Sequence, residues 1–182
     1  MADKTIRGPF GVEKGITTDN VGTVASGSSV VEYGDGVFHQ TVITVDTTLP
    51  TIASGNHGYG KLVYTFPAGA LDVKATYMSM ALTQTDGNIT LDTPDIGIGT
   101  VIATGSTSAT LDAGTEEDIM GGQTADNCNG TAEVKHLATG LIIAATGGVD
   151  HTVHFNAAAN WSGTDDACAI AGTIIIEWTF VV

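Results

Sequence analysis

The last ten residues of the chain alternate between two kinds of position. Every even position from 174 to 182 is apolar, whereas the polar residues of this stretch, Thr173, Glu177 and Thr179, all occupy odd positions. Because successive side chains of a β-strand point to opposite faces, the alternation predicts a strand with one buried face over 173–182. The predicted buried row is Ile174, Ile176, Trp178, Phe180 and Val182.

A second alternating stretch precedes it at 149–157. Its odd positions are apolar apart from His151, and its even positions are polar. The intervening residues 160–166 are rich in Gly, Ser, Asn and Asp, which is typical of a turn. We therefore expect these two strands to pair with each other as an antiparallel C-terminal pair. The same alternation places His151 at the edge of the core face and His154 on the surface face.

Turn residues separate further extended segments in the first half of the chain. Asp35-Gly36 lies between two apolar segments, a setting in which this dipeptide predicts a β-hairpin. An alternating strand is expected at 61–66, and Pro67-Ala68-Gly69 then ends it. Residues 71–83 follow as an extended segment that is apolar on both faces. Such two-sided apolarity predicts burial in the middle of the structure or at a subunit interface.

Three later segments are shorter or less regular. Ile96, Ile98, Thr100 and Ile102 predict another alternating strand. Thr115-Glu116-Glu117-Asp118 resembles a helix start, but Gly121-Gly122 follows at once, so we expect a short helix or none. The stretch 131–145 suits either a helix or two strand pieces, and we favour strands because its surroundings are β.

These elements predict an all-β fold, an antiparallel β-sandwich that is jelly-roll-like. Residues 1–29 contain many glycines and no sustained period, which predicts an extended N-terminal arm. Residues 30–182 then form a single β-sandwich domain, as expected for a chain of this length. No internal repeat of fixed length argues for a propeller or a solenoid.

Charge narrows the range of partners. The chain carries a net charge of −14, and three of its six cationic residues lie within the first fourteen positions. Nucleic-acid binding draws its affinity from Lys and Arg, so an acidic body with three scattered cations argues against that partner. No apolar run approaches the ~20 residues that span a bilayer, and we expect no membrane partner. The polar start of the chain also predicts synthesis in the cytoplasm without export.

Candidate metal sites are weak. His151 and His154 lie three residues apart, which puts them on opposite faces of a strand, and no second cysteine lies close enough to Cys128 and His136 for a structural zinc site. Acidic loops are possible calcium ligands, although acids in turns are normally solvated. The loop candidates are Asp86 with Asp92 and Asp95, Glu116 to Asp118, and Asp165 with Asp166. We assign no metal and no cofactor.

Catalytic signals are weaker still. The sequence holds no Gly-x-Ser-x-Gly elbow and no phosphate loop followed by a helix, so we assign no catalytic residue and do not expect an enzyme. Cys128 and Cys168 allow one disulfide, but a chain of this size does not need it and we expect free thiols. Trp161 lies in a turn, where its ring could stack on a sugar or pack over the end of the sandwich.

Two segments resemble a known group of proteins. Residues 36–45, GVFHQTVITV, and 60–70, GKLVYTFPAGA, are similar to short Gly- and Thr-rich virion structural proteins of tailed bacteriophages, especially marine phages. The likeness covers roughly residues 33–83. It implies a non-enzymatic component of the particle, with a head decoration or cement protein on the capsid exterior as the best position. The implied partner is the major capsid protein.

A cement protein acts through interfaces, and the sequence offers two. The arm would contact the shell by strand addition or groove filling. A symmetric oligomer, most simply a homotrimer, would add avidity and would bury either the apolar strand 71–83 or the C-terminal sheet. The alternatives are a carbohydrate- or receptor-binding β module of a tail or fibre, and an acidic surface or secreted protein from a salty environment. The candidate capsid contacts are Lys4, Arg7, Phe10, Val12, Lys14 and Ile16, and the candidate oligomer contacts are Tyr77, Met78, Met80 and Leu82.

Overall fold

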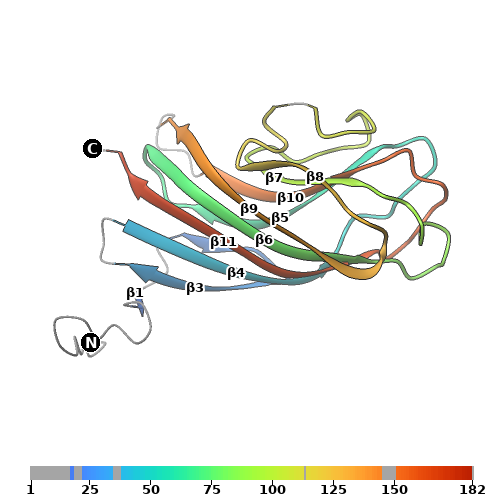
Figure 1. Ribbon diagram of the computed structural model, residues 1–182, viewed down its shortest axis with the longest axis horizontal. Coiled ribbons are helices and arrows are strands. Elements are labelled where there is room, and N and C mark those ends of the chain that lie inside the picture. The colour runs from blue at the N-terminus through green and yellow to red at the C-terminus, as the bar shows by residue number, and fades with distance from the viewer. Residues whose placement is uncertain (1–16, 19–21, 35–37, 113, 145–150, 182) are drawn as a thin grey trace.

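A computed structural model describes residues 17–18, 22–34, 38–112, 114–144 and 151–181. The described chain forms eleven β-strands and no helix, arranged as two sheets that face each other (Figure 1). The first six strands are β1 (Thr17–Thr18), β2 (Thr23–Val24), β3 (Ser28–Gly34), β4 (Phe38–Thr48), β5 (Gly58–Phe66) and β6 (Leu71–Thr83). The last five are β7 (Asp95–Gly99), β8 (Met120–Thr124), β9 (Asn129–Ile143), β10 (His151–Ala158) and β11 (Ala169–Phe180).

The strand order identifies the sandwich as a jelly roll. Sheet A has the order β1-β3-β4-β11-β6-β9, sheet B has the order β2-β5-β10-β7-β8, and every pairing is antiparallel. Within them, β4 pairs with β11, β5 with β10, β6 with β9, and β7 with β8. These four nested pairs, with β4–β11 outermost and β7–β8 innermost, are those of a long hairpin rolled into two sheets, which confirms the predicted architecture.

The core fills the space between the sheets. In β11 the predicted row Ile174, Ile176 and Trp178 is fully buried, as the alternation indicated. The two-sided apolar segment 71–83 is strand β6, which lies inside sheet A between β11 and β9. Its inward side chains are among the largest contributors to the core: Leu71, Val73, Met78, Met80 and Leu82.

The expected pairing of the last two strands is wrong. β10 pairs with β5 and β7 in sheet B, whereas β11 pairs with β4 and β6 in sheet A. The connection between them therefore crosses from one sheet to the other, visible at the right of Figure 1. Alternation shows which side chains share a face, but it carries no information on which strand lies alongside.

Other local expectations are settled more simply. β3 and β4 form the hairpin expected around Asp35-Gly36, with Gly34 paired to His39, although the turn residues lie outside the described residues. Residues 131–145 are strand rather than helix as far as Ile143, and 115–118 form turns. β7 ends at Gly99 instead of extending to Ile102, because the chain there leaves the sheet.

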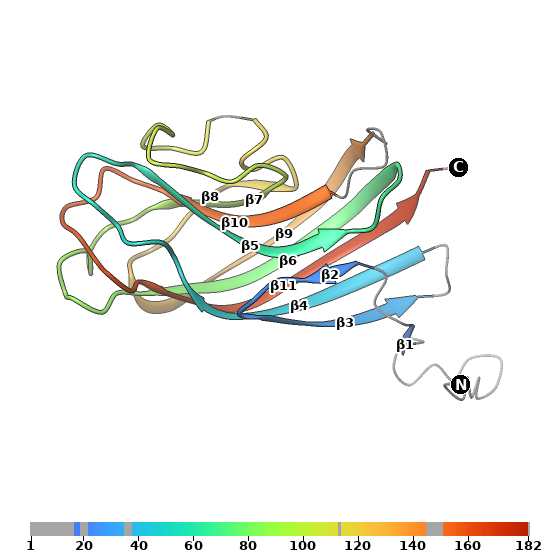
Figure 2. The same ribbon diagram turned by 180° about the vertical axis from the view of Figure 1, so that it is seen from behind.

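The departing chain, residues 100–112 and 114–119, folds back over the outer face of sheet B. Figures 1 and 2 both show it as a separate layer beside β7, β8 and β10. Close approach requires small residues beneath it: a Cβ atom added at Gly60 would lie 2.3 Å from Asn156 Oδ1 and 2.5 Å from Ile102 Cγ1. The polar face of β10 is therefore covered, and both faces of this strand are buried.

The predicted arm is only partly described. Thr17–Thr18 pairs with β3 at the border of sheet A, and Thr23–Val24 pairs with β5 at the border of sheet B. The six candidate capsid contacts all precede Thr17 and lie outside the described residues. They are Lys4, Arg7, Phe10, Val12, Lys14 and Ile16.

Candidate functional site

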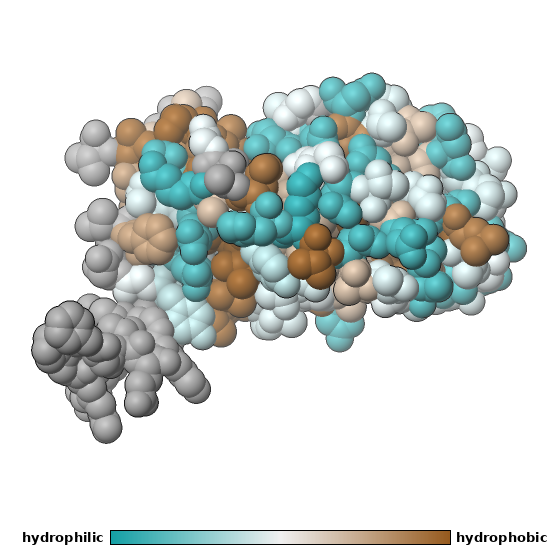
Figure 3. All heavy atoms as spheres, viewed as in Figure 1, coloured by the Kyte–Doolittle hydropathy of each residue, from teal (hydrophilic) through white to brown (hydrophobic). Residues whose placement is uncertain are grey.

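The outer face of sheet A is the broadest regular surface of the described chain. Strand register aligns Val31, Val42, Ile175, Tyr77 and His136 in one row across five strands. The next row consists mainly of short polar side chains: Ser29, Thr44, Thr173, Ser79 and Val134. Figure 3 looks onto this side and shows scattered apolar side chains among polar ones rather than one apolar patch.

This face carries few charges for so acidic a chain. Glu177 and Asp46 lie in the flanking rows, and Glu177 accepts a hydrogen bond from Gln40 Nε2 at 3.0 Å. At one end Lys74 forms an ion pair with Asp72 on the same strand. The net charge is −14, so a second copy that docks on this face is repelled less strongly than one that docks elsewhere on the body.

The four oligomer candidates separate onto two faces of β6. Met78 and Met80 are 0% exposed and Leu82 is 1% exposed, and all three point into the core between the sheets. They are thus occupied within the subunit and do not form a surface. Only Tyr77 lies on the outer face, half-buried in the apolar row described above. The two-sided pattern had two causes, a core row and a weaker outer row, and the sequence could not separate them.

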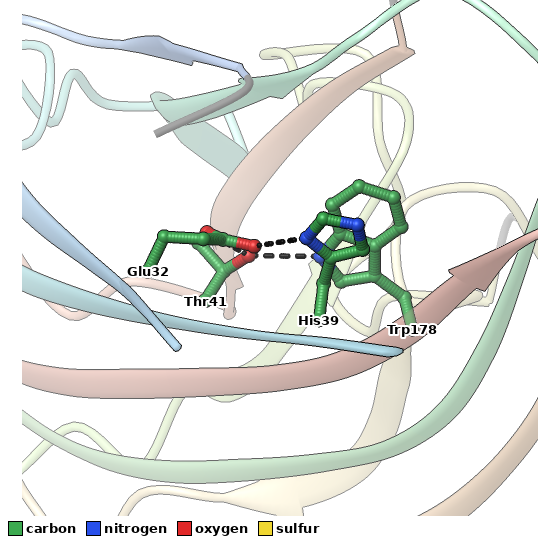
Figure 4. A network of polar contacts seen from close by, with 4 residues as sticks. All are labelled: Glu32, His39, Thr41 and Trp178. Atoms are coloured by element: carbon green, nitrogen blue, oxygen red, sulfur yellow. Dashed lines mark hydrogen bonds and ion pairs between the residues drawn. The ribbon is translucent and has the colours of Figure 1, made fainter. Parts of the chain in front are cut away.

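A polar network lies inside the core near the end of sheet A (Figure 4). Glu32 Oε1 lies 3.1 Å from His39 Nδ1, and Thr41 Oγ1 donates to Glu32 Oε2 at 2.8 Å. Trp178 Nε1 in turn donates to Thr41 Oγ1 at 2.8 Å. Strand register explains the grouping, because Glu32 pairs directly with Thr41 and His39 directly with Trp178.

Aromatic packing encloses this network. The His39 ring stacks on the Trp178 ring with centroids 4.2 Å apart, and Phe180 meets both rings edge-on. The His39 and Glu32 side chains are only 3% and 0% exposed. A buried acid and imidazole of this kind resemble a catalytic pair in composition, but the enclosure leaves no room for a substrate. Its hydrogen bonds join β3, β4 and β11 and so stabilise the fold.

Burial dominates the protonation chemistry of the network. It raises the pKa of Glu32, against the opposing hydrogen bond from Thr41 and the charge and hydrogen bond of His39. Burial, followed by the nearby Glu32 charge, raises the pKa of Tyr64 well above its usual range. Among the described residues, His39 Nε2 is buried without a hydrogen-bond partner. The sequence analysis missed this site, because Glu32 and His39 are joined only by the hairpin register.

The acidic loops use their carboxylates to hold backbone N–H groups. Asp165 is 0% exposed and accepts from the N–H groups of Thr85, Asp86 and Ala167 at 2.7–3.0 Å and from Thr85 Oγ1 at 3.0 Å. Five other candidates also accept from backbone N–H groups: Asp86 from Asp166 N, Asp92 from Ser162 N, Asp95 from Leu111 N, Glu117 from Gly122 N, and Asp118 from Thr100 N. Glu116 instead accepts from Thr107 Oγ1. Among the described residues, no group of three or more His, Cys, Asp or Glu side chains is arranged to hold a metal ion.

The expectation that His154 lies on the surface is wrong. His154 is only 8% exposed beneath residues 100–119, not on the surface, and burial lowers its pKa. His151 is half-buried and its Nε2 lies 2.9 Å from Gly69 O. Beside His154, Asn156 is fully buried and binds the covering chain through three hydrogen bonds. The sequence pattern correctly places His154 and Asn156 on the polar face of the strand, but it cannot show that residues 100–119 cover this face.

Trp161 is packed rather than displayed. Its Nε1 donates to His57 O at 2.7 Å, and its ring meets Tyr59 edge-on at a centroid distance of 6.0 Å. A shallow hollow of about 370 Å³ lies nearby between the loops, lined by Leu91, Asp92, Thr93, Ala109, Thr110, Ala159 and Asn160. No Trp or Tyr lines it. The geometry therefore gives the sugar-stacking interpretation no aromatic platform at this place.

Both cysteines are free thiols in the core. Cys128 Sγ lies 3.6 Å from Asp92 O, and burial raises the pKa of each thiol to about 12. Such thiols remain protonated and are poor nucleophiles at neutral pH.

Comparison with known proteins gives no relative for this chain. No family model, no curated protein and no solved structure matches it. The described residues contain no helix of the length and apolarity needed to cross a membrane.

Proposed function

We propose that this chain is a non-enzymatic structural protein of a tailed bacteriophage particle. It decorates the capsid exterior, binds the major capsid protein as an oligomer, most simply a homotrimer, and strengthens the shell by bridging its subunits. The observation that carries the proposal is the outer face of sheet A, a broad and weakly charged surface. The rest of the acidic body would repel a second copy electrostatically. No cofactor takes part.

The interior of the molecule supports a mechanical role. Its most unusual polar groups, the Glu32 network and the Asp165 carboxylate, are enclosed and act as ties between strands and loops. Jelly rolls occur in viral capsid proteins and in lectins, so the fold agrees with the proposal by analogy alone. A carbohydrate-binding module of a tail or fibre shares that analogy, but Trp161 is half-buried and packed on Tyr59, which gives the alternative no specific support.

The outer face of sheet A just reaches the size of a stable interface. β4, β11, β6 and β9 each carry about six outward positions and β3 carries three, so at ~4.8 Å by ~6.8 Å per position the area is about 880 Å². A stable interface buries about 800 Å² on each partner. Nearly the whole face would have to be buried to reach that size, so the N-terminal arm adds contact area, and an oligomer multiplies these contacts through avidity. The arm's net charge of +1 over fourteen residues orients it on an acidic neighbour without supplying most of its binding energy.

Imaging of purified particles that contain the chain tests the location directly. We expect a jelly-roll density on the outer capsid surface at a threefold or quasi-threefold position. A position on the tail, or absence from the particle, would refute the proposal. The alternative gains support from glycan-array binding that is lost in Trp161→Ala and retained in Tyr77→Ala. Binding to no glycan would remove that alternative.

The attachment mechanism is tested with truncated protein. Chains lacking residues 1–14 are mixed with capsids that lack the protein, and co-sedimentation is compared with that of the full chain. We expect the truncated protein to lose attachment while its unfolding midpoint in urea stays unchanged. Equal co-sedimentation of the two proteins would contradict a role for the arm.

A further inference from the structure

β9 forms an open border of sheet A. It is the longest strand of the described chain, and β6 is the strand that pairs with it. No other described strand lies on its outer side, as Figures 1 and 2 show where its last residues end the sheet. Backbone N–H and C=O groups on such an edge are a template for another strand.

The two halves of β9 differ in how they are protected. In the first half, Glu133 accepts from Asp126 N at 2.7 Å and Lys135 donates to Gly121 O, so two charged side chains reach toward β8. The second half, residues 137–143, has the sequence LATGLII and no charge. Leu137 and Ile142 there are 38% and 55% exposed. These seven residues carry no charge and no proline, and their one irregularity is the register shift against β6 between Ala138 and Leu141.

We propose that residues 137–143 of β9 receive, as an added antiparallel strand, the N-terminal segment 5–16 of a second copy of this chain. The inference rests on the proposed function in taking the chain to be an oligomer, and it assigns the arm a receiver within that oligomer. Repeated from copy to copy, the contact is head-to-tail, and it closes into a ring such as a trimer when the rotation between copies allows it.

Sheet topology sets the direction of this contact. β1 and β9 are the opposite borders of sheet A, five strand spacings apart, and the segment 5–16 joins the chain at β1. Adjacent strands alternate in direction throughout the sheet, so β1 and β9 run in opposite directions. A neighbouring copy placed to continue the sheet therefore presents its arm antiparallel to β9.

The chain's own arm is less well placed. It would have to cross five strands, or ~24 Å, before reaching β9 of the same copy. Neighbouring strands are also rotated by roughly 20–25°, which amounts to about 100–125° between the two borders. A second copy needs one strand spacing and one such rotation.

The segment itself has the composition of an added strand. Ile6, Phe10, Val12 and Ile16 all fall on even positions, so in an extended conformation they share one face. Twelve extended residues span ~40 Å, whereas the seven residues 137–143 of β9 require ~23 Å. Residues 5–16 carry Arg7, Lys14 and Glu13, a net charge of +1, so the acidic body of a second copy does not repel the segment.

The first experiment measures self-association of the full chain and of a chain lacking residues 1–16 by analytical ultracentrifugation at 1–100 µM. We expect the full chain to form closed or growing oligomers and the truncated chain to stay monomeric. A synthetic peptide of residues 3–18 is then added to the truncated chain, and its fluorescence anisotropy is followed beside that of a scrambled peptide. Binding of the native-sequence peptide alone is the expected result.

The second experiment locates the receiver. The double variant Leu137→Lys/Ile142→Lys places charges on either side of the open edge, and both side chains are already partly exposed, so folding should persist, as circular dichroism can verify. We expect its affinity for the peptide to fall roughly tenfold or more. The matched control is Leu91→Lys, at a leucine 86% exposed in a loop, which should bind normally. Equal affinity of both variants, or no peptide binding, overturns the proposal.

The outcomes also separate this inference from the proposed function. A truncated chain that remains oligomeric but no longer attaches to capsids would mean that the arm contacts the shell directly, and the β9 assignment would be wrong. A truncated chain that becomes monomeric and attaches weakly agrees with arm exchange between copies. A full chain that stays monomeric at all concentrations would mean that the arm does not bind a second copy, which likewise contradicts the inference.

Discussion

Asn156 provides the sharpest test of how the outer layer is held on sheet B. Its Oδ1 accepts from Ala103 N at 2.9 Å, and its Nδ2 donates to Val101 O at 2.9 Å and to Glu116 O at 2.6 Å. One fully buried side chain thus fixes three points of residues 100–119. We expect Asn156→Ala to release this layer while leaving the two sheets intact.

The magnitude follows from what each partner can do after the change. Val101 is 46% exposed, so water can replace its lost hydrogen bond at little cost. Ala103 and Glu116 are 3% and 7% exposed, and their backbone groups would remain buried without partners at about 1–3 kcal/mol each. We therefore expect a loss of about 3 kcal/mol in the free energy of unfolding, with partial release of the layer reducing it.

Urea unfolding followed by tryptophan fluorescence measures this loss, and hydrogen exchange reports the Ala103 amide directly. Asn156→Asp is the informative companion, because it keeps the acceptor for Ala103 but places a carboxylate against two carbonyl oxygens. Asn160→Ala, at an exposed asparagine, is the control and should change stability by less than about 0.5 kcal/mol. A loss below 1 kcal/mol in Asn156→Ala, with unchanged exchange at Ala103, would refute the assigned role.

Two further predictions concern pH. Burial lowers the pKa of His154, so the unfolded chain, with a His pKa near 6.5, takes up this proton more readily than the folded chain. The free energy of unfolding should therefore be constant above pH ~6.5 and fall below it, by at most about 1.4 kcal/mol per pH unit. His154→Gln should reduce the change of the urea midpoint between pH 7 and 5.5, whereas His136→Gln, at an exposed site, should leave that change as it is in the unmodified chain. The same change in both variants would contradict this reasoning. Burial alone would raise the pKa of Asp165, but the hydrogen bonds from Asp86, Thr85 and Ala167 outweigh it and lower the pKa. Its stabilisation is therefore present above pH ~4 and is lost in more acidic solution. Asp165→Asn should cost about 3 kcal/mol at pH 7, and Asp166→Asn, on an exposed side chain, almost nothing.

Each strand of the core could be located from the sequence where one face is buried and the other is not. The row Ile174, Ile176 and Trp178 is the clearest case, and the hairpin before His39 is another. Both depend on interactions between near neighbours along the chain, the pleat of one strand or the turn between two. Local chemistry was therefore sufficient for the all-β class and for most of the longer strands, whereas the end of β7 at Gly99 and the short strand β8 were not predicted.

The candidate site was less accessible to the same reasoning. The alternation identified Tyr77 and Met78 as opposite faces of one strand, but nothing in it shows which face another sheet covers. His154 and Asn156 lie on a polar face that residues 100–119 then bury. Glu32 and Trp178 come together through β4, which lies between their strands in the sheet.

The sequence by itself determined the all-β class, most of the longer strands, the buried row of β11 and the asymmetry between a weakly basic start and an acidic body. Only the tertiary structure decided that β10 and β11 lie in different sheets, that Met78, Met80 and Leu82 belong to the core, and that β9 pairs with β6 alone among the described strands. The reason is physical: side-chain alternation is a property of a single strand, whereas pairing and coverage depend on contacts between residues distant in the chain.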